Sequence, residues 1–396
     1  MNYKELKAWH TSQRETSLSG RHISLPQIEA LFNNIAVSFK VEKIGSSVEG
    51  RSISSIKCGT GKIHILAWSQ MHGNEGTTTK AVFDLLKWLI NNPTQEFIKH
   101  FLELNTLLII PMLNPDGAHR YTRLNANGVD LNRDAQDRSQ PESVVLRKVY
   151  DEFKPDFCLN LHGQRTIFGV GQPAKSSIVS FLSPAQDELR MVTHSRRRGM
   201  HIIGEMSQML HEFIPESVGR YDDSFNINCV GDTFQQLNTP TILFEAGHFP
   251  NDYMREETRS LIFLSLVKAL ETIHLAENKE NIDSSAYFSI PENQKCFYDF
   301  IIRQIKLPNR GVIDVAVQYE EKLIEGELHF IPRISKIGDL SGYLGHEEIQ
   351  AKGDSPSQNT VNQWEEGEII KKLFLNSKLT TTFSIKNRKN VMNNSM

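Results

Sequence analysis

Apolar runs alternate with amphipathic segments over most of this chain. Runs of strand length predict buried strands at 54–57, 63–68, 107–111, 157–161 and 241–244. Helices are predicted at 77–90, 141–153 and 254–276, and one or two longer helices are predicted within 185–213. Because strands that are apolar throughout and alternate with helices are covered on both faces, we predict an α/β domain.

The α/β pattern is flanked by two regions of different character. The first forty residues are predicted to form a helical lead-in, with Leu25-Pro26 as a turn. The polar stretch 277–285 is a candidate linker, and beyond it 311–319 and 327–330 alternate polar and apolar residues with period two. We therefore predict three parts, which are a lead-in at 1–40, an α/β domain at 41–276 and a small β-rich domain at 286–385. The polar end, 387–396, is expected to be frayed.

Composition narrows the possible partners. The formal net charge of -3 gives no reason to expect nucleic acid or an anionic membrane as a partner. The first 25 residues lack the apolar core of a signal peptide, and no apolar run approaches membrane-spanning length. The four cysteines, which are Cys58, Cys158, Cys229 and Cys296, are far apart and are expected to be free thiols in a reducing compartment. We expect a cytoplasmic protein and make no prediction of its oligomeric state.

Reactive side chains follow several of the predicted strands. His72 and Glu75 come after the second strand, His162 after the fourth and Glu245 after the fifth. Ligands in an open α/β sheet bind beyond the carboxyl ends of the strands, so we expect these four residues to converge. His72, Glu75 and His162 are the predicted ligands of one zinc ion per chain, with a position left open for water. Zinc lowers the pKa of bound water toward about 7, so Glu245 can act as the general base.

Cationic residues complete the predicted site. Arg123 is assigned to the oxyanion of the tetrahedral intermediate. Asn132 and Arg133 offer an amide and a fork-shaped donor, which suit bidentate capture of a terminal carboxylate. Asp130 is expected to orient Arg133 or a ligand histidine. Three other features have less specific interpretations. Residues 114–117 are predicted to form a tight turn, and 196–198 a solvated helix face. Arg165 is either a substrate contact or one half of an ion pair.

Several segments resemble the zinc carboxypeptidase family, the funnelin-type metallopeptidases. They are Gly-Ser-Ser-Val-Glu-Gly-Arg at 45–51, His-Gly-Asn-Glu at 72–75, Asn-Pro-Asp-Gly at 114–117, Gly-Val-Asp-Leu-Asn-Arg at 128–133, Asn-Leu-His at 160–162 and Phe-Glu at 244–245. The resemblance covers roughly residues 41 to 275. It implies a zinc carboxypeptidase-like central mixed sheet of about eight strands between helices, with Arg51 in the substrate groove. The family's substrate-capping tyrosine has no clear counterpart, and Tyr221 is the nearest.

The resemblance leaves the reaction open. Compact bacterial members of the family, which include murein-peptide amidases, carry a block like 123–133. The C-terminal β region and the segments at 72–75 and 245–247 also resemble the aspartoacylase and succinylglutamate desuccinylase branch, which cleaves N-acyl amino acids. We predict a zinc-dependent metallocarboxypeptidase acting on peptides with a free carboxylate. The alternatives are a deacylase of N-acyl amino acids, a murein-peptide amidase, and a binding module without activity, which is disfavoured because every metal and base position is filled.

Overall fold

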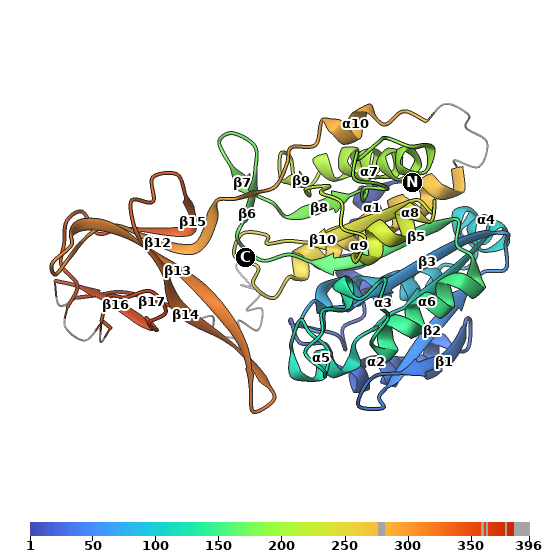
Figure 1. Cartoon of the computed structure of the whole chain (residues 1–396), viewed down its shortest axis with the longest axis horizontal. Coiled ribbons are helices and arrows are strands. Elements are labelled where there is room, and N and C mark those ends of the chain that lie inside the picture. Colours follow the sequence, from blue (N-terminus) through green and yellow to red (C-terminus); the bar gives the residue numbers. More distant parts are fainter. Residues whose placement is uncertain (276–281, 358–359, 362, 377, 384–396) are drawn as a thin grey trace, which may run out of the picture. The chain divides into compact units, whose positions relative to one another are not determined.

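A computed structural model describes residues 1–275, 282–357, 360–361, 363–376 and 378–383 (Figure 1). The predicted linker lies partly outside the described residues, and the predicted frayed end lies wholly outside them. The chain divides into two compact units, which are Met1–Arg165 with Gly169–Gln294 and Thr166–Phe168 with Lys295–Met396. Within the described ranges, none of the helices is long and apolar enough to cross a membrane.

The first unit is built on an eight-stranded sheet in the order β1-β2-β4-β3-β5-β10-β8-β9. The strands are β1 Lys40–Ser46, β2 Ser52–Cys58, β3 Ile63–Ser69, β4 Asn105–Ile110, β5 Phe157–Gly163, β8 Val179–Leu182, β9 Val218–Arg220 and β10 Thr241–Ala246. Strands β4, β3, β5 and β10 run parallel, whereas β1, β2 and β8 are antiparallel to neighbours. The sheet is therefore mixed and eight-stranded, as predicted.

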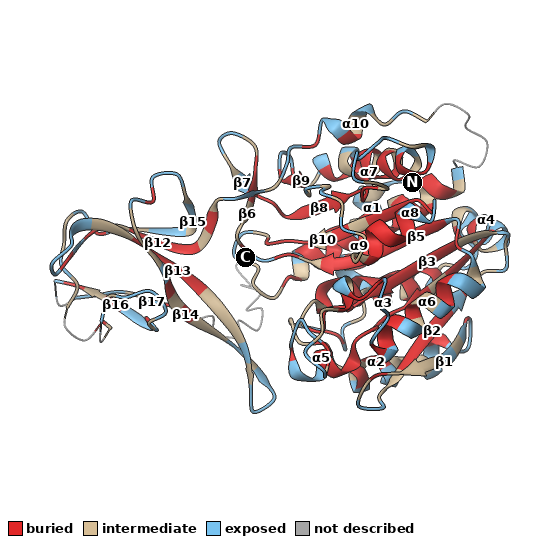
Figure 2. Cartoon of the chain, in the orientation of Figure 1, coloured by how far each residue is buried: buried red, intermediate tan, exposed pale blue. Residues whose placement is uncertain are grey.

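Helices cover both faces of this sheet. They are α1 Tyr3–Gln13, α2 Leu25–Ile35, α3 Gly76–Asn91, α4 Glu96–Leu104, α5 Pro115–Arg120, α6 Pro141–Phe153, α7 His194–His211, α8 Val230–Gln236, α9 Glu256–Leu275 and α10 Ser285–Phe288, with a 3-10 turn η1 at Leu131–Arg133. Along β3, Ile65 and Ala67 join one apolar cluster while Leu66 and Trp68 join the other. The central strands are accordingly buried (Figure 2). Burial on both faces explains why these strands are apolar throughout.

The second unit is β-rich, as predicted. Its main sheet has four strands in the order β14-β13-β12-β15, formed by β12 Phe297–Leu307, β13 Gly311–Ile324, β14 Glu327–Gly338 and β15 Leu344–Gln350. A hairpin of β16 Lys372–Leu375 and β17 Lys378–Thr382 shares its apolar core. The remaining short strands of the chain lie outside the sheets described above, and they are β6 Phe168–Val170, β7 Lys175–Ser176 and β11 Gln294–Lys295.

Two local predictions were wrong. Leu25 and Pro26 begin α2 instead of forming a turn, because Ser24 caps that helix and donates its backbone N–H to Gln27 at 2.8 Å. Residues 114–117 do not form only a turn, since Asn114 caps α5. The region 185–213 holds one long helix, α7, as predicted, and the residues before His194 form a loop.

The arginine run at 196–198 was also misread. Arg196 is buried instead of solvated, because it donates to the carbonyl of Ser183 at 3.0 Å and to Asp223 at 2.8 Å. Arg198 lies over the ring of Phe157, 4.3 Å from its centroid. The hydrogen bonds of Arg196 therefore attach the 183–193 loop to the rest of the unit.

Candidate active site

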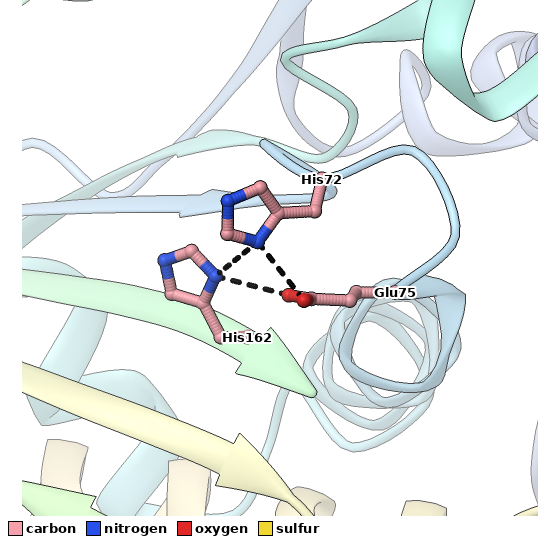
Figure 3. Close-up of side chains that lie close together, drawn as sticks. All are labelled: His72, Glu75 and His162. Atoms are coloured by element: carbon pink, nitrogen blue, oxygen red, sulfur yellow. Dashed lines mark hydrogen bonds and ion pairs between the residues drawn. The ribbon is translucent and has the colours of Figure 1, made fainter. Parts of the chain in front are cut away.

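The three predicted metal ligands meet at one point (Figure 3). His72 follows β3, Glu75 immediately precedes α3, and His162 lies on β5. The Nδ1 atoms of the two histidines are 3.1 Å apart. Nδ1 of His72 lies 2.9 Å from Oε1 of Glu75, and Nδ1 of His162 lies 3.0 Å from Oε2 of the same carboxylate. Both histidines are buried.

This donor set fits a zinc ion. A tetrahedral zinc with ligand bonds of about 2.0–2.1 Å places its ligand atoms about 3.3 Å apart. The three separations here are 2.9, 3.0 and 3.1 Å. Two imidazole nitrogens that face each other cannot both carry a proton in the space between them, and both also face carboxylate oxygens. One divalent cation at the centre satisfies all these lone pairs, so we expect His72, Glu75 and His162 to hold it.

The turn that carries His72 is fixed by Gln70. Gln70 has a left-handed φ of +48°, which is uncommon outside glycine. Its side-chain amide donates to the carbonyls of Ile23 at 2.8 Å and Gly73 at 2.9 Å, and its Oε1 accepts from Thr79 at 2.8 Å. These buried hydrogen bonds stabilise the turn in the conformation that presents His72.

A second brace comes from residues 114–117. The Asn114 side chain accepts from Gly117 N at 2.8 Å and donates to the carbonyl of Met71 at 3.2 Å. The backbones of Gly73 and Gly117 touch so closely that a Cβ on Gly73 would lie 1.9 Å from the Gly117 carbonyl carbon. Only glycine allows this approach. The segment at 114–117 therefore packs directly against the metal-binding turn and stabilises it.

Asp130 supports His72 and not Arg133. Nε2 of His72 donates to Oδ1 of Asp130 at 3.1 Å, and Arg123 Nε donates to Oδ2 at 3.1 Å. Burial alone would raise the pKa of Asp130, but the hydrogen bond and charge of His72, together with Arg123, hold it well below its ordinary value. A carboxylate on the far nitrogen of a metal-binding imidazole fixes its tautomer and orientation. This arrangement is the one expected around a ligated histidine.

Glu245 stands beside the ligands on the neighbouring strand. In the parallel pairing of β10 with β5, Glu245 is the register partner of His162. Burial raises the pKa of Glu245 well above its ordinary value, and the charge of Glu75 adds to this, whereas Arg123 and Arg255 oppose it. Among the described residues, its Oε2 has no hydrogen-bond partner. A buried carboxyl with high proton affinity beside a metal site can carry a proton between substrate groups.

The predicted cationic residues differ in their positions. Arg123 reaches the ligand set, with Nη1 3.5 Å from Oε1 of Glu75. Arg133 donates to the carbonyl of Asn132 at 2.7 Å and contacts Cys229 Sγ at 3.1 Å. The Asn132 Oδ1 accepts from Val230 N at 3.0 Å, so its amide oxygen fixes the first turn of α8.

Arg51 lies in a separate ion cluster. It pairs with Glu49 and, at 2.6 Å, with the buried Asp116, which also accepts from Ser47 at 2.8 Å. Within the described part of the chain, no hydrogen bond or ion pair joins Arg51 to the metal ligands or to Glu245. A place for Arg51 in the substrate groove stays a prediction.

Tyr221 belongs to this neighbourhood, although its sequence context carried no recognisable motif. It directly follows β9, and its backbone N–H donates to Phe181 O at 3.0 Å. Its phenol has a pKa raised by burial and by the charges of Glu245 and Glu75. Arg165, in contrast, is exposed and has no ion pair with any described residue, which removes the structural ion pair considered for it.

The fold and the donor set fit a mononuclear zinc site of the catalytic type, in which His72, Glu75 and His162 would bind the ion and a fourth position would be left for water. Comparisons with known proteins agree. Residues 28–144 match the family model described as zinc carboxypeptidase. The chain is 38% identical over 104 residues to a carboxypeptidase of Arabidopsis thaliana, covering 24% of this chain and 21% of that protein. It is 21% identical over 284 residues to carboxypeptidase D of Mus musculus, covering 61% and 21%.

Solved structures show the same fold. A metallo-carboxypeptidase from Burkholderia cenocepacia has a TM-score of 0.52 and 18% identity, covering 64% of this chain and 69% of that chain. A carboxypeptidase A from Helicoverpa armigera has a TM-score of 0.51 and 18% identity, covering 70% and 80%. The chain spans less than half the length of the curated relatives it matches. The predicted resemblance to the zinc carboxypeptidase family is confirmed over residues 28–144, and the solved metallo-carboxypeptidases share the fold.

Proposed function

We propose that this protein is a zinc-dependent metallocarboxypeptidase that hydrolyses the C-terminal peptide bond of peptides. The observation that carries the proposal is the convergence of His72, Glu75 and His162 with Glu245 in register beside them. Bound zinc would supply a Lewis acid that lowers the pKa of a water molecule toward about 7. The remaining steps belong to the protein's own side chains.

Glu245 takes the proton from the attacking water and delivers it to the leaving amine. Burial and the charge of Glu75 hold the pKa of Glu245 above its ordinary value, which favours a carboxyl that retains the proton between these two transfers. Arg123, exposed at the rim and 3.5 Å from Glu75, donates to the carbonyl oxygen as negative charge develops on it. Asp130 keeps Nδ1 of His72 directed at the metal.

The free carboxylate of the substrate is assigned to Arg133 and the Asn132 side chain. The bond from Val230 N to Asn132 holds this pair at the start of α8. A Pseudomonas aeruginosa metallo-carboxypeptidase with a TM-score of 0.52 to this chain was solved in complex with (2-guanidinoethylmercapto)succinic acid, a ligand that carries carboxylates. A planar guanidinium such as that of Arg133 suits bidentate binding of a carboxylate. Binding of the substrate's terminal carboxylate is what an exopeptidase requires.

Paired substrates test the proposal directly. Zinc-loaded protein is incubated with N-blocked peptides whose C-terminus is either a free acid or an amide, and released amino acids are measured. We expect hydrolysis of the acids only, lost on chelation and in Glu245→Gln, which should still bind zinc. Equal cleavage of acids and amides would contradict the assignment. Hydrolysis only of N-acyl amino acids or of murein peptides in a parallel assay would favour a deacylase or an amidase instead.

We also propose a cytoplasmic location, on the basis of the buried free thiols of Cys58 and Cys158. Fractionation of cells that express the tagged protein tests this, and recovery in the medium or in a membrane fraction would contradict it.

A further inference from the structure

Arg255 is a buried arginine directly before α9, and the chemistry proposed above does not use it. Its side chain is 1% exposed. Nη1 donates to the carbonyl of Ala246 at 2.8 Å, and Nη2 donates to the carbonyl of Gln164 at 3.1 Å. One planar guanidinium therefore spans two backbone carbonyls that are far apart in sequence.

These two carbonyls belong to the ends of the strands that carry the site. Ala246 is the last residue of β10 and is bonded to Glu245. Gln164 comes directly after β5, two residues beyond His162. The parallel pairing of the two strands ends at Ala246 and Gly163, and Gln164 N donates to Ala246 O at 3.0 Å just beyond it. Arg255 thus joins the strands at the point where their own ladder stops.

The backbone conformation of Arg255 indicates that an arginine side chain is needed at this position. Its φ is +61°, in the left-handed region that favours glycine and asparagine. The start of α9 is already capped by Asp252, which accepts from Glu256 N at 3.0 Å and from Glu257 N at 2.7 Å. An arginine is therefore not required for the cap, and a glycine would meet the backbone demand with less strain. The contribution of the guanidinium offsets that strain.

The charge of Arg255 also acts on Glu245. Burial is the main cause of the raised pKa of Glu245, and Arg255 is one of two cations that oppose the rise. The other is Arg123, which is exposed. Of these two cations only Arg255 is buried, and it lies directly before α9.

We propose that Arg255 is a positioning residue that holds the ends of β5 and β10 together and so fixes Glu245 relative to His162. The inference rests on the proposed function only in taking Glu245 as the proton carrier. The hydrogen bonds from Arg255 to Ala246 and Gln164 go to the backbone at the ends of the two strands, so it acts on Glu245 through the position of the backbone. A displacement of about 1 Å at a catalytic group can lower the rate about 100-fold, which sets the size of the expected effect.

The test compares Arg255→Met and Arg255→Lys with a matched control in the adjoining helix. Arg259 lies in the first turn of α9, is also 1% exposed, and donates to both oxygens of Asp84 at 2.6 and 2.7 Å. Its partners belong to α3, to the N-terminal segment and to the start of α9, and not to β5 or β10. Arg259→Met therefore removes a buried guanidinium of equal size without disturbing the strand ends.

For each variant, kcat, KM, zinc affinity and melting temperature are measured on the full chain. We expect Arg255→Met to lower kcat about 100-fold while KM and zinc affinity change less than about threefold. Arg255→Lys should recover at least about tenfold of that loss, because an ammonium retains the charge and can donate to one carbonyl. Arg259→Met should lower the melting temperature but leave kcat within about twofold of the parent.

The inference is wrong if Arg255→Met and Arg259→Met lower kcat equally at the same interval below their melting temperatures. It is also wrong if zinc affinity falls more than about tenfold, since Arg255 would then support the metal site in general. If Arg255→Met does not fold, the comparison uses Arg255→Lys and Arg259→Lys. Should the parent cleave no peptide, the proposed function fails, and crystal structures decide the inference: Glu245 must shift relative to His162 in Arg255→Lys but not in Arg259→Lys.

Discussion

Replacing Gly73 with alanine should abolish metal binding, whereas the same change at Gly163 should not. The two glycines form a matched pair, because each directly follows a predicted ligand histidine, His72 or His162. They differ in the space available for a methyl group. A Cβ at Gly73 would lie 1.9 Å from the Gly117 carbonyl carbon and 2.1 Å from Ala118 N, whereas a Cβ at Gly163 would have its nearest neighbours at 3.6 Å.

The size of the effect follows from these distances. Ordinary contact begins near 3.4 Å, so the turn at Gly73 and the start of α5 would have to separate by about 1.5 Å. Both sides of the contact are backbone, and no side chain can rotate away. Metal–ligand distances tolerate deviations of only about 0.2 Å, so a shift of this size removes His72 from the ligand set. We expect zinc affinity to fall by more than the 10- to 100-fold that the loss of a supporting residue costs.

Competition with a chromophoric chelator measures zinc affinity of the parent and both variants, and circular dichroism establishes that they are folded. Gly73→Ala should bind zinc at least about 100-fold more weakly than the parent, and Gly163→Ala within about threefold. Gly73→Ala protein with parental zinc affinity would refute the reasoning, because α5 would then have moved without displacing His72. Equal losses in both variants would show that any added methyl group disturbs the site.

Three further predictions concern charged residues. Asp130→Ala should weaken zinc binding 10- to 100-fold in the same competition assay by releasing the far nitrogen of His72, and unchanged affinity would contradict that role. Burial raises the pKa of Asp232 to about 7, although the nearby charge of Arg133 opposes this rise. Ionisation of Asp232 above that pH should therefore raise KM for free-carboxylate substrates in the parent, but not in Asp232→Asn. A KM that rises equally in both would count against it. Burial lowers the pKa of Lys80 to about 8 from its ordinary value of 10.5. The unfolded chain therefore binds more protons between these two values, and the free energy of unfolding should rise with pH there, by at most about 3 kcal/mol. Urea unfolding of Lys80→Met should lack that rise, and an identical slope would refute the assignment.

The sheet could be predicted because its pattern is local. Strands β3 and β5 are mostly apolar, since both of their faces are covered, and that pattern is visible in five or six consecutive residues. Helix α6 occupies Pro141–Phe153, the predicted bounds, because Pro141 can begin a helix and the αL residue Lys154 ends it.

The loop before α7 could not be predicted in the same way. Residues 183–193 have a composition compatible with helix, but Arg196 binds the carbonyls of Arg190 at 2.7 Å and Ser183 at 3.0 Å, along with Asp223. Those partners come from the loop itself and from a segment beyond α7. A buried arginine that satisfies loop carbonyls has the same local sequence as one that faces solvent, so the charge run alone pointed to the wrong environment.

The candidate site was also predictable only in part, because some of its residues stand in local motifs and others do not. Its chemistry was predictable, because the ligand and base positions stand in short motifs at strand ends. Asp130 apart, the residues that hold them were not, because Gln70 and Arg255 act through contacts across the fold, to Ile23 and to Gln164. Such residues have no fixed spacing from the groups that they support.

The two half-buried glutamates of the site illustrate how environment assigns roles that residue type cannot. Glu75 lies between two imidazoles and accepts from Gly163 N at 3.0 Å, and although burial acts to raise its pKa, these partners hold it far below its ordinary value. Glu245 lacks such partners, so burial and the charge of Glu75 raise its pKa. Two carboxyl groups whose proton affinities are driven apart in one site take different tasks. The low-affinity carboxylate binds the cation and the high-affinity one carries the proton, and each requires the other, because the charge of Glu75 is part of what keeps Glu245 ready to accept a proton.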